Sequence, residues 1–304
     1  MSLYPDKEPE CLNAGTRAID LVIRAQPRDL GGFTVRRALP SGRRRLVGPF
    51  IFWDHMGPAT FAPHQGVDVR PHPHIGLATV TYLFDGEIVH KDTLGSDQAI
   101  RPGAVNWMTA GSGIAHSERS SPEARRQGVH VHGIQSWVAL PLDHEETEPS
   151  FRHHPGNTIP ETSLDGVRLR ILAGAAYGLT SPARVFSPMF YVEAVVPAGA
   201  RICLPDEHEE RAAYVVGGAI ACDGEEAGEG DMVVVRAKVE AVLHARRPSR
   251  VMLLGGARMD GPRHIWWNFV SSSEARIEQA KRDWTAGRFG KIRGDDVEFI
   301  PLPD

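Results

Sequence analysis

Short runs of apolar residues, separated by glycine, proline and aspartate, recur along most of the chain. Each run is about the length of one β-strand, and the residues between the runs favour turns. This spacing predicts an all-β sandwich or barrel rather than strands that alternate with helices. The runs occupy residues 18–23, 46–52, 78–84, 104–108, 129–138 and 167–172.

Apolar residues at helical spacing appear only near the end of the chain, at residues 277–284. The Ser-x-x-Glu spacing of a capping box precedes them at residues 271–274, and Gly287 follows them. We therefore predict one amphipathic helix at residues 273–286, with its apolar stripe packed on the core.

An internal repeat divides the chain into two similar halves. Residues 211–222 can be laid on residues 79–90, so that Tyr214 falls against Tyr82, and a glycine and an isoleucine follow at the same distances in both segments. A repeat of this kind predicts two units of similar topology.

A polar, proline-flanked stretch at residues 141–160 predicts the boundary between the two units. We expect a first domain at residues 1–147 and a second at residues 148–304. The end of the chain, residues 297–303, is too apolar for a free terminus, so we expect it to pack back on a barrel.

The balance of charges excludes some classes of partner. The formal net charge is −4 at pH 7, and the lack of a basic surplus argues against binding to nucleic acid or to an anionic membrane. The three cysteines form no Cys-x-x-Cys, so neither a disulfide framework nor a thiolate metal site is predicted.

Because no segment resembles a signal peptide and no apolar run approaches ~20 residues, we expect a soluble, cytoplasmic monomer.

Two pairs of metal-binding residue types stand out from the strand pattern. His72 and His74 are two residues apart, as are His116 and Glu118, and residues two apart on a strand point to the same face. The imidazoles of an isolated His-x-His often only cap a loop or bond to a buried polar group. The two pairs on facing strands, however, would form a site of three imidazoles and one carboxylate. The rival His-x-His at residues 130–132 has no carboxylate pair to accompany it.

The second half has lost these pairs. The register of the repeat sets His72 and His74 against Leu204 and Asp206, and His116 against Leu243. We therefore expect no metal in the second barrel. An irregular site remains an alternative there, and its ligands would be Asp206, His208 and His244.

Three segments resemble the pirin family of two-domain cupins. They read FWDHMGP at residues 52–58, RPHPHIGLATVTYLFDGEI at residues 70–88 and IRPGAVNWMTAGSGIAHSE at residues 100–118. Their order, spacing and length make the resemblance specific. It implies two cupin barrels of the jelly-roll type, with iron in the N-terminal barrel. The positions that match the metal ligands of the family are His72, His74, His116 and Glu118.

The chain departs from the family directly after the first ligand pair. Many pirins read His-Pro-His-Arg-Gly-Phe-Glu there, whereas this chain has Ile75, Leu77 and Ala78, so a charged pair near the metal is missing. None of these positions is expected to bind the metal. The departure therefore concerns the substrate chemistry rather than the metal.

The expected ligand set determines what the site could do. Three neutral imidazoles and one carboxylate suit a borderline divalent ion and leave two positions open if the ion is six-coordinate. The resemblance favours Fe(II), while Zn, Ni, Mn or Cu could also bind, and a closed structural zinc site remains an alternative. Open positions would admit an enolic substrate and dioxygen. Glu118 could also accept a proton from a substrate hydroxyl, which would make it both a ligand and a catalytic base.

Side chains around the site would have to hold a flat aromatic substrate and support the imidazoles. The candidates for an apolar substrate pocket are Trp53, Ile75, Trp107 and Met108. Metal-bound imidazoles generally need a partner for the other ring nitrogen. The candidates for that supporting role are Asp54, His55, His130 and His132.

Two functions from different classes are compatible with these residues. The resemblance implies a quercetin 2,3-dioxygenase-like enzyme, whose partners would be a small aromatic substrate and O2. The alternative is a non-enzymatic regulatory protein that senses metal or redox state and binds a protein partner. Because one fold carries unrelated functions, the fold does not decide between them.

Overall fold

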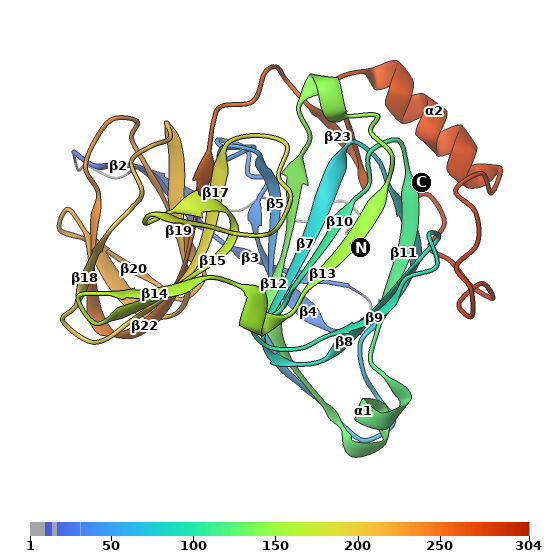
Figure 1. Ribbon diagram of the computed structural model, residues 1–304, viewed down its shortest axis with the longest axis horizontal. Coiled ribbons are helices and arrows are strands. Elements are labelled where there is room, and N and C mark those ends of the chain that lie inside the picture. The colour runs from blue at the N-terminus through green and yellow to red at the C-terminus, as the bar shows by residue number, and fades with distance from the viewer. Residues whose placement is uncertain (1–9, 14–16, 31, 304) are drawn as a thin grey trace.

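The computed structural model describes residues 10–13, 17–30 and 32–303, and its strands form two barrels that lie side by side (Figure 1). Within these ranges no helix is long and apolar enough to span a bilayer. The predicted all-β fold with two barrels and one C-terminal helix is confirmed. The helices are α1 (Pro122–Gln127), α2 (Glu274–Thr285) and the 3₁₀ helices η1 (Leu142–His144) and η2 (Gly156–Thr158).

The first barrel consists of a seven-stranded and a four-stranded antiparallel sheet. Val35 and Leu83 of the larger sheet pack against Val69 and Ile88 of the smaller one. The larger sheet has the order β13 (Ser150–His154), β10 (Val105–Thr109), β7 (Leu77–Gly86), β12 (Val129–Ala139), β5 (Phe50–Phe61), β4 (Thr34–Leu39) and β3 (Gln26–Asp29). The smaller sheet has the order β6 (Asp68–His74), β11 (Ile114–Arg119), β8 (Ile88–Asp92) and β9 (Asp97–Ile100).

The second barrel is one antiparallel sheet of eleven strands. Its main path runs through β1 (Glu10–Asn13), β2 (Ile19–Arg24), β21 (Asp231–Val235), β19 (Glu210–Cys222), β22 (Val242–Gly256), β17 (Met189–Val196), β15 (Val167–Ala176) and β14 (Glu161–Leu164). Three further strands pair beside this path, namely β16 (Leu179–Thr180), β18 (Arg201–Cys203) and β20 (Glu225–Gly228).

Within the described residues, a segment near each terminus lies against the barrel formed by the other half of the sequence. Strands β1 and β2 join the second barrel beside β21, and in Figure 1 the blue β2 lies among its orange strands. After β22 the chain returns to the first barrel as the hairpin β23 (His264–Trp266) and β24 (Phe269–Ser271). The N–H of Val270 donates to the carbonyl of Ile75, and the N–H of Ile300 donates to the carbonyl of Pro71. The C-terminal segment therefore lies along the first barrel.

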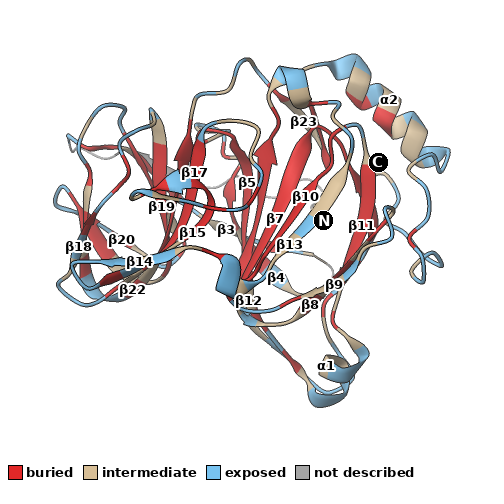
Figure 2. Ribbon diagram, in the orientation of Figure 1, coloured by how far each residue is buried: buried red, intermediate tan, exposed pale blue. Residues whose placement is uncertain are grey.

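Helix α2 covers the side of the first barrel on which β24 lies (Figure 2). Its buried residues Ile277 and Ala280 pack with Ile75 and Phe269, while the opposite face is exposed. The N-cap is Ser273, whose hydroxyl accepts from the N–H of the residue three positions later. The predicted Ser-x-x-Glu box is therefore out of register by two residues.

The passage between the barrels lies after β13. This strand pairs with β10 of the first barrel, whereas β14 pairs with β15 of the second. Residues 155–160 therefore connect the barrels, a few residues beyond the predicted boundary at 147 and 148. The division into domains 1–147 and 148–304 stays a prediction, because β1 and β2 lie on the second barrel and the segment after β22 lies on the first.

The internal repeat recurs as equivalent strand positions in the two barrels. Tyr82 and Tyr214 are both buried in one cluster of core residues between the barrels. Gly86 and Gly218 follow them at φ +87° and +93°, a conformation that favours glycine. A Cβ atom on Gly86 would lie 1.8 Å from a main-chain carbonyl oxygen, so this glycine is required by space as well as by φ.

A polar contact accompanies the aromatic residues between the barrels. The ring of His55 lies with Nε2 2.8 Å from Nε2 of His132, and with Nδ1 3.0 Å from the hydroxyl of Tyr214 and 3.2 Å from Arg36. An arginine can only donate, so Nδ1 of His55 accepts and its Nε2–H donates to His132. Burial, helped by the nearby Arg36 and His132, lowers the pKa of His55 to about 2. The folded protein therefore holds His55 neutral.

This neutral histidine predicts a loss of stability in mild acid. Below pH 6.5 the unfolded chain binds a proton at His55 and the folded protein does not until about pH 2, so the free energy of unfolding falls as the pH falls through that window. Between pH 7 and pH 5 this one group should cost about 2 kcal/mol. Urea unfolding of metal-free protein at both pH values should show a smaller loss in His55→Asn than in the unchanged protein. The control His130→Asn, at an exposed histidine, should behave like the unchanged protein, and equal losses in all three would contradict the prediction.

Candidate metal centre

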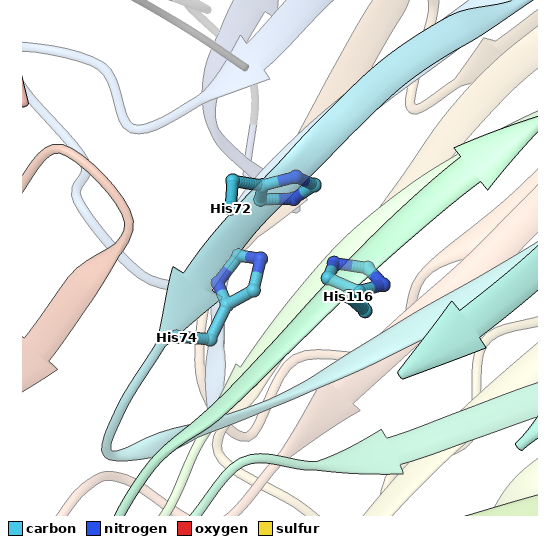
Figure 3. A group of neighbouring side chains, drawn as sticks. All are labelled: His72, His74 and His116. Atoms are coloured by element: carbon cyan, nitrogen blue, oxygen red, sulfur yellow. The ribbon is translucent and has the colours of Figure 1, made fainter. Parts of the chain in front are cut away.

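Strands β6 and β11 bring three imidazoles together inside the first barrel. His72 and His74 occupy alternate positions of β6, and His116 lies directly opposite His72 on β11. All three side chains are fully buried, and Figure 3 shows their rings gathered around one point. One ring nitrogen from each lies within 4.8 Å of the other two. Two adjacent antiparallel strands thus produce a cluster that the alternation of side chains predicts.

The hydrogen bonds of these rings leave nitrogen lone pairs pointing at one another. His72 donates from Nδ1 to the carbonyl of Arg70 at 2.8 Å, and its Nε2 has no partner. His116 contacts His90 through Nδ1, and its Nε2 also has no partner. The ring of His74 lies near the main chain of Asn268, but neither of its nitrogens forms a hydrogen bond of good geometry. Buried polar atoms without partners are rare and costly, so the cluster fits a metal ion.

The electrostatics of the cluster favour neutral imidazoles. Burial lowers the pKa of His72 and His116 well below the usual range, and it lowers the pKa of His74 to about 3. Mutual repulsion between the rings acts in the same direction for His72 and His116. Since metal ions bind the neutral form of histidine, the three rings are ready as ligands at neutral pH.

Glu118 lies beside the cluster but is not part of it. It follows His116 by two residues on β11, beyond an irregularity in the pairing with β6. The hydroxyl of Thr81 lies 3.4 Å from its carboxylate and 2.8 Å from the amide oxygen of Gln135. Burial raises the pKa of Glu118. The structure therefore brings together three of the four predicted ligands, and coordination by Glu118 stays a prediction that requires its side chain to turn.

A small cavity adjoins Glu118 within the barrel. Its volume is about 10 Å³, which is enough for about one water molecule. Apolar side chains such as Met56 and Ile88 line it, together with Glu118, Asp54 and Gln135.

The four residues predicted to form a substrate pocket lie in three separate clusters of buried side chains. Trp53 and Trp107 belong to the core between the barrels, where the ring of Trp53 is 5.4 Å from that of Tyr214. Met108 packs in a second cluster, and Ile75 packs beneath helix α2. The structure does not bring them together around the imidazoles, so their contact with a substrate stays a prediction.

The aromatic residue that does contact the cluster is Trp137 of β12. Its ring lies 5.1 Å from that of His74 and stacks on Phe52 at 3.9 Å. No sequence motif singles out Trp137, because its position opposite β6 depends on how the two sheets face each other.

The residues predicted to support the imidazoles have other hydrogen-bond partners. Asp54 is paired with Arg37 in a buried ion pair, while His55 and His132 contact each other between the barrels. His130 is exposed and lies near Thr60. These strands belong to the larger sheet, and two of the three histidines point away from the interior of the first barrel.

Two residues beside His116 that sequence reasoning missed are His90 and Asp92 of β8. Both are buried, and they lie opposite Glu118 and His116 on the neighbouring strand. Although burial alone would raise the pKa of Asp92, hydrogen bonds from His90 and Ser96 lower it. The His-x-Asp spacing at residues 90–92 has the same period of two as the chosen ligand pairs and could have identified them.

The second barrel has an aliphatic core at the corresponding place. Leu243 of β22 pairs with Ile202 of β18, as His116 pairs with His72. Ile202, Leu204 and Leu243 are buried in one cluster. Ile202 and Leu204 therefore take the places of His72 and His74. The alignment of the two halves predicted from the sequence, which set these histidines against Leu204 and Asp206, is wrong by two residues. In the described part of the chain, no further group of three His, Cys, Asp or Glu side chains has its ligand atoms within 4.8 Å of one another.

Comparison with known proteins shows that both barrels match a single family. A family model described as Pirin matches residues 32–138, and one described as the Pirin C-terminal cupin domain matches residues 191–290. A pirin-like protein of Caulobacter vibrioides is 52% identical over 289 residues, which cover 94% of this chain and 100% of that protein.

Similarity extends to proteins that carry the name of an enzyme. A Pseudomonas aeruginosa protein named provisionally as a quercetin 2,3-dioxygenase is 39% identical over 280 residues, which cover 90% of this chain and 87% of that protein. The crystal structure of a quercetin 2,3-dioxygenase from Acinetobacter baumannii matches with a TM-score of 0.87 and 33% identity, over 93% of this chain and 94% of that one.

Proposed function

The chain belongs to the pirin family, and on this premise we propose that it is an iron-dependent dioxygenase that opens the ring of a flavonol or a related enolic aromatic compound with O2. The observation that carries the proposal is the buried cluster of His72, His74 and His116, whose nitrogen lone pairs have no other partner. The names of the similar bacterial proteins support the reaction class.

The hydrogen bonds indicate which atoms would hold the ion. His72 and His116 would bind through Nε2, because each Nδ1 is engaged on the other side of the ring. His74 would supply the third nitrogen and Glu118 an oxygen. The bound metal would supply a charged, redox-active centre at which the substrate and dioxygen meet.

Glu118 is proposed to act on the proton of the substrate. Its carboxylate is buried next to Thr81 and Gln135, so it is shielded from bulk water that would otherwise exchange the proton. An enolic hydroxyl placed against the imidazoles could transfer its proton to this carboxylate. Trp137 would exclude water on the side of His74.

The size of the cavity constrains how a substrate is bound. Ligand sites in enzymes usually measure roughly 300–1,000 Å³, whereas the cavity beside Glu118 measures about 10 Å³. A flavonol does not fit this cavity as it stands. We therefore propose that substrate binding displaces side chains near Glu118. That the protein acts as a cytoplasmic monomer stays a prediction from the sequence.

Oxygen consumption tests the proposal directly. Protein loaded anaerobically with Fe(II) should consume O2 with at least one member of a panel of flavonols and other enolisable aromatic compounds, with matching loss of the visible absorption of the flavonol. His72→Ala/His116→Ala treated in the same way should not. If the loaded protein consumes no O2 with any member of the panel, the dioxygenase function is wrong.

A second candidate function is favoured by the closure of the site. All three imidazoles are fully buried, which suits a metal that sets the conformation of the protein as well as one that meets a substrate. In that case the protein would be a regulatory sensor, and a specific protein partner should be recovered in only one iron state. Such a result, together with a failed oxygen assay, would replace the enzyme by the sensor.

A further inference from the structure

We propose that His90 and Asp92 are positioning residues that hold His116 in the tautomer that presents Nε2 to the metal. This inference rests on the proposed metal site, and it concerns a hydrogen-bonded chain on the side of His116 away from the other two imidazoles. Strand β8 supplies both residues and lies next to β11 on the side opposite β6.

The hydrogen-bonded chain runs from His116 through His90 and Asp92 to the main chain. Nδ1 of His116 lies 3.2 Å from Nδ1 of His90. Nε2 of His90 lies 3.0 Å from Oδ2 of Asp92. The other carboxylate oxygen, Oδ1, accepts from the main-chain N–H groups of Leu94 and Ser96 at 2.9 and 3.0 Å. Every polar atom of His90 and Asp92 is therefore engaged.

Only one arrangement of protons satisfies all of these contacts with a metal in place. The ionised carboxylate of Asp92 can only accept, so the proton lies on Nε2 of His90. Neutral His90 then has a lone pair on Nδ1 and accepts from Nδ1–H of His116. The lone pair of His116 is thereby placed on Nε2, which is the buried nitrogen that has no other partner.

Packing restricts the movement of His90 and Asp92. The ring of Phe151 stacks on that of His90, with centroids 4.2 Å apart and planes at 7°. The turn after Asp92 is joined to β11, since the N–H of Thr93 donates to the carbonyl of Ala115 and the N–H of Ala115 lies 3.3 Å from the hydroxyl oxygen of Thr93. These contacts hold the plane of the His90 ring, and the hydrogen bonds to Asp92 and His116 select the ring flip that turns Nδ1 towards His116.

Support of this kind distinguishes His116 from His72. The Nδ1–H of His72 donates to a main-chain carbonyl two residues away, which no substitution removes. His116 depends on a side chain, so its support can be changed without touching any of the three imidazoles. A histidine that donates towards a carboxylate is a stronger ligand, and loss of such a partner typically costs 10–100-fold in metal affinity.

Two variants of nearly equal size separate the hydrogen bond from packing. His90→Asn places an amide oxygen near the position of Nδ1, so it can still accept from His116, whereas His90→Leu cannot. Affinity for Co(II) would be measured by competition with a chelator, together with the visible absorption of the bound Co(II), which reports ligand geometry. We expect His90→Leu to bind 10–100-fold more weakly with a changed spectrum, and His90→Asn to stay within about threefold of the unchanged protein.

Asp92→Asn provides an independent test. The amide group would favour the opposite tautomer of His90, and the affinity for Co(II) should again fall 10–100-fold. The control Asp97→Asn, at an exposed carboxylate on the next strand that pairs with Lys91, should leave the affinity unchanged. Melting temperatures of the metal-free variants show whether each variant folds.

The outcomes distinguish this inference from the proposed function. If the unchanged protein binds no Co(II), the metal site itself is wrong. If it binds Co(II) and His90→Leu and Asp92→Asn bind equally well, the positioning role is wrong and the metal site stands. Equal losses in His90→Asn and His90→Leu would also overturn the inference, because they would point to packing rather than to a hydrogen-bond acceptor.

Discussion

Protein in which His72 and His116 are both replaced by alanine should contain no bound metal after loading with Fe(II) and desalting, while the unchanged protein should retain one ion. The two substitutions remove two of the three nitrogen lone pairs that meet inside the first barrel. Loss of one supporting partner behind a ligand already costs 10–100-fold in affinity, so loss of two direct ligands should cost far more. Elemental analysis of the desalted protein measures the metal content.

The matched control changes two histidines of the second barrel, His208→Ala and His244→Ala. Metal content should be unchanged there, because the place that corresponds to the cluster is filled by Ile202 and Leu243. Circular dichroism of each metal-free variant shows whether the fold is kept. Full metal content in a folded His72→Ala/His116→Ala protein would falsify the site.

Replacement of Glu118 by glutamine should lower turnover per bound iron by roughly 10²–10⁴-fold, the usual contribution of a general base. The amide oxygen can still coordinate a metal but cannot accept the proton of an enolic substrate. Metal content should therefore fall much less than turnover. Both quantities would be measured on the same sample, as oxygen consumption and as iron by elemental analysis.

A control for the loss of a buried carboxylate is Glu193→Gln. Glu193 is buried between the barrels, where it accepts from the hydroxyl of Tyr82 and pairs with Arg250. An amide can still accept from Tyr82, and turnover should stay unchanged. If Glu118→Gln loses turnover and iron in parallel, Glu118 is a ligand only and the proton must go elsewhere.

The predicted substrate pocket shows that residue type alone does not predict where a side chain points. Trp53 is a large apolar side chain, which makes it a candidate for an apolar substrate pocket around the metal. In the structure it lies two residues before His55 on β5 and packs with Tyr214 of the second barrel. Its direction depends on which face of β5 meets the other barrel, and that pairing is not encoded in the local pattern of residues.

Strand β13 shows the limit of reading a linker from composition. Residues 150–154 are polar except for Phe151 and follow a proline, which are features of an exposed connection. The strand nevertheless pairs with β10 at the edge of the first barrel and places Phe151 on the ring of His90. An edge strand that is only half buried has no strict alternation, so hydrophobic periodicity does not detect it.

The sequence by itself determined the features that depend on neighbours within one segment. Short apolar runs bounded by turn residues predicted the strands, the period of two along a strand placed His72 and His74 on one face, and helical spacing with a serine cap predicted α2. Only the tertiary structure decided which strands meet, because strand pairing joins residues far apart in the chain. It brought His116 opposite His72, placed His90 and Asp92 behind His116, and sent a segment near each terminus to the opposite barrel. These contacts depend on register between distant strands and on the packing of two barrels, for which a local pattern carries no information.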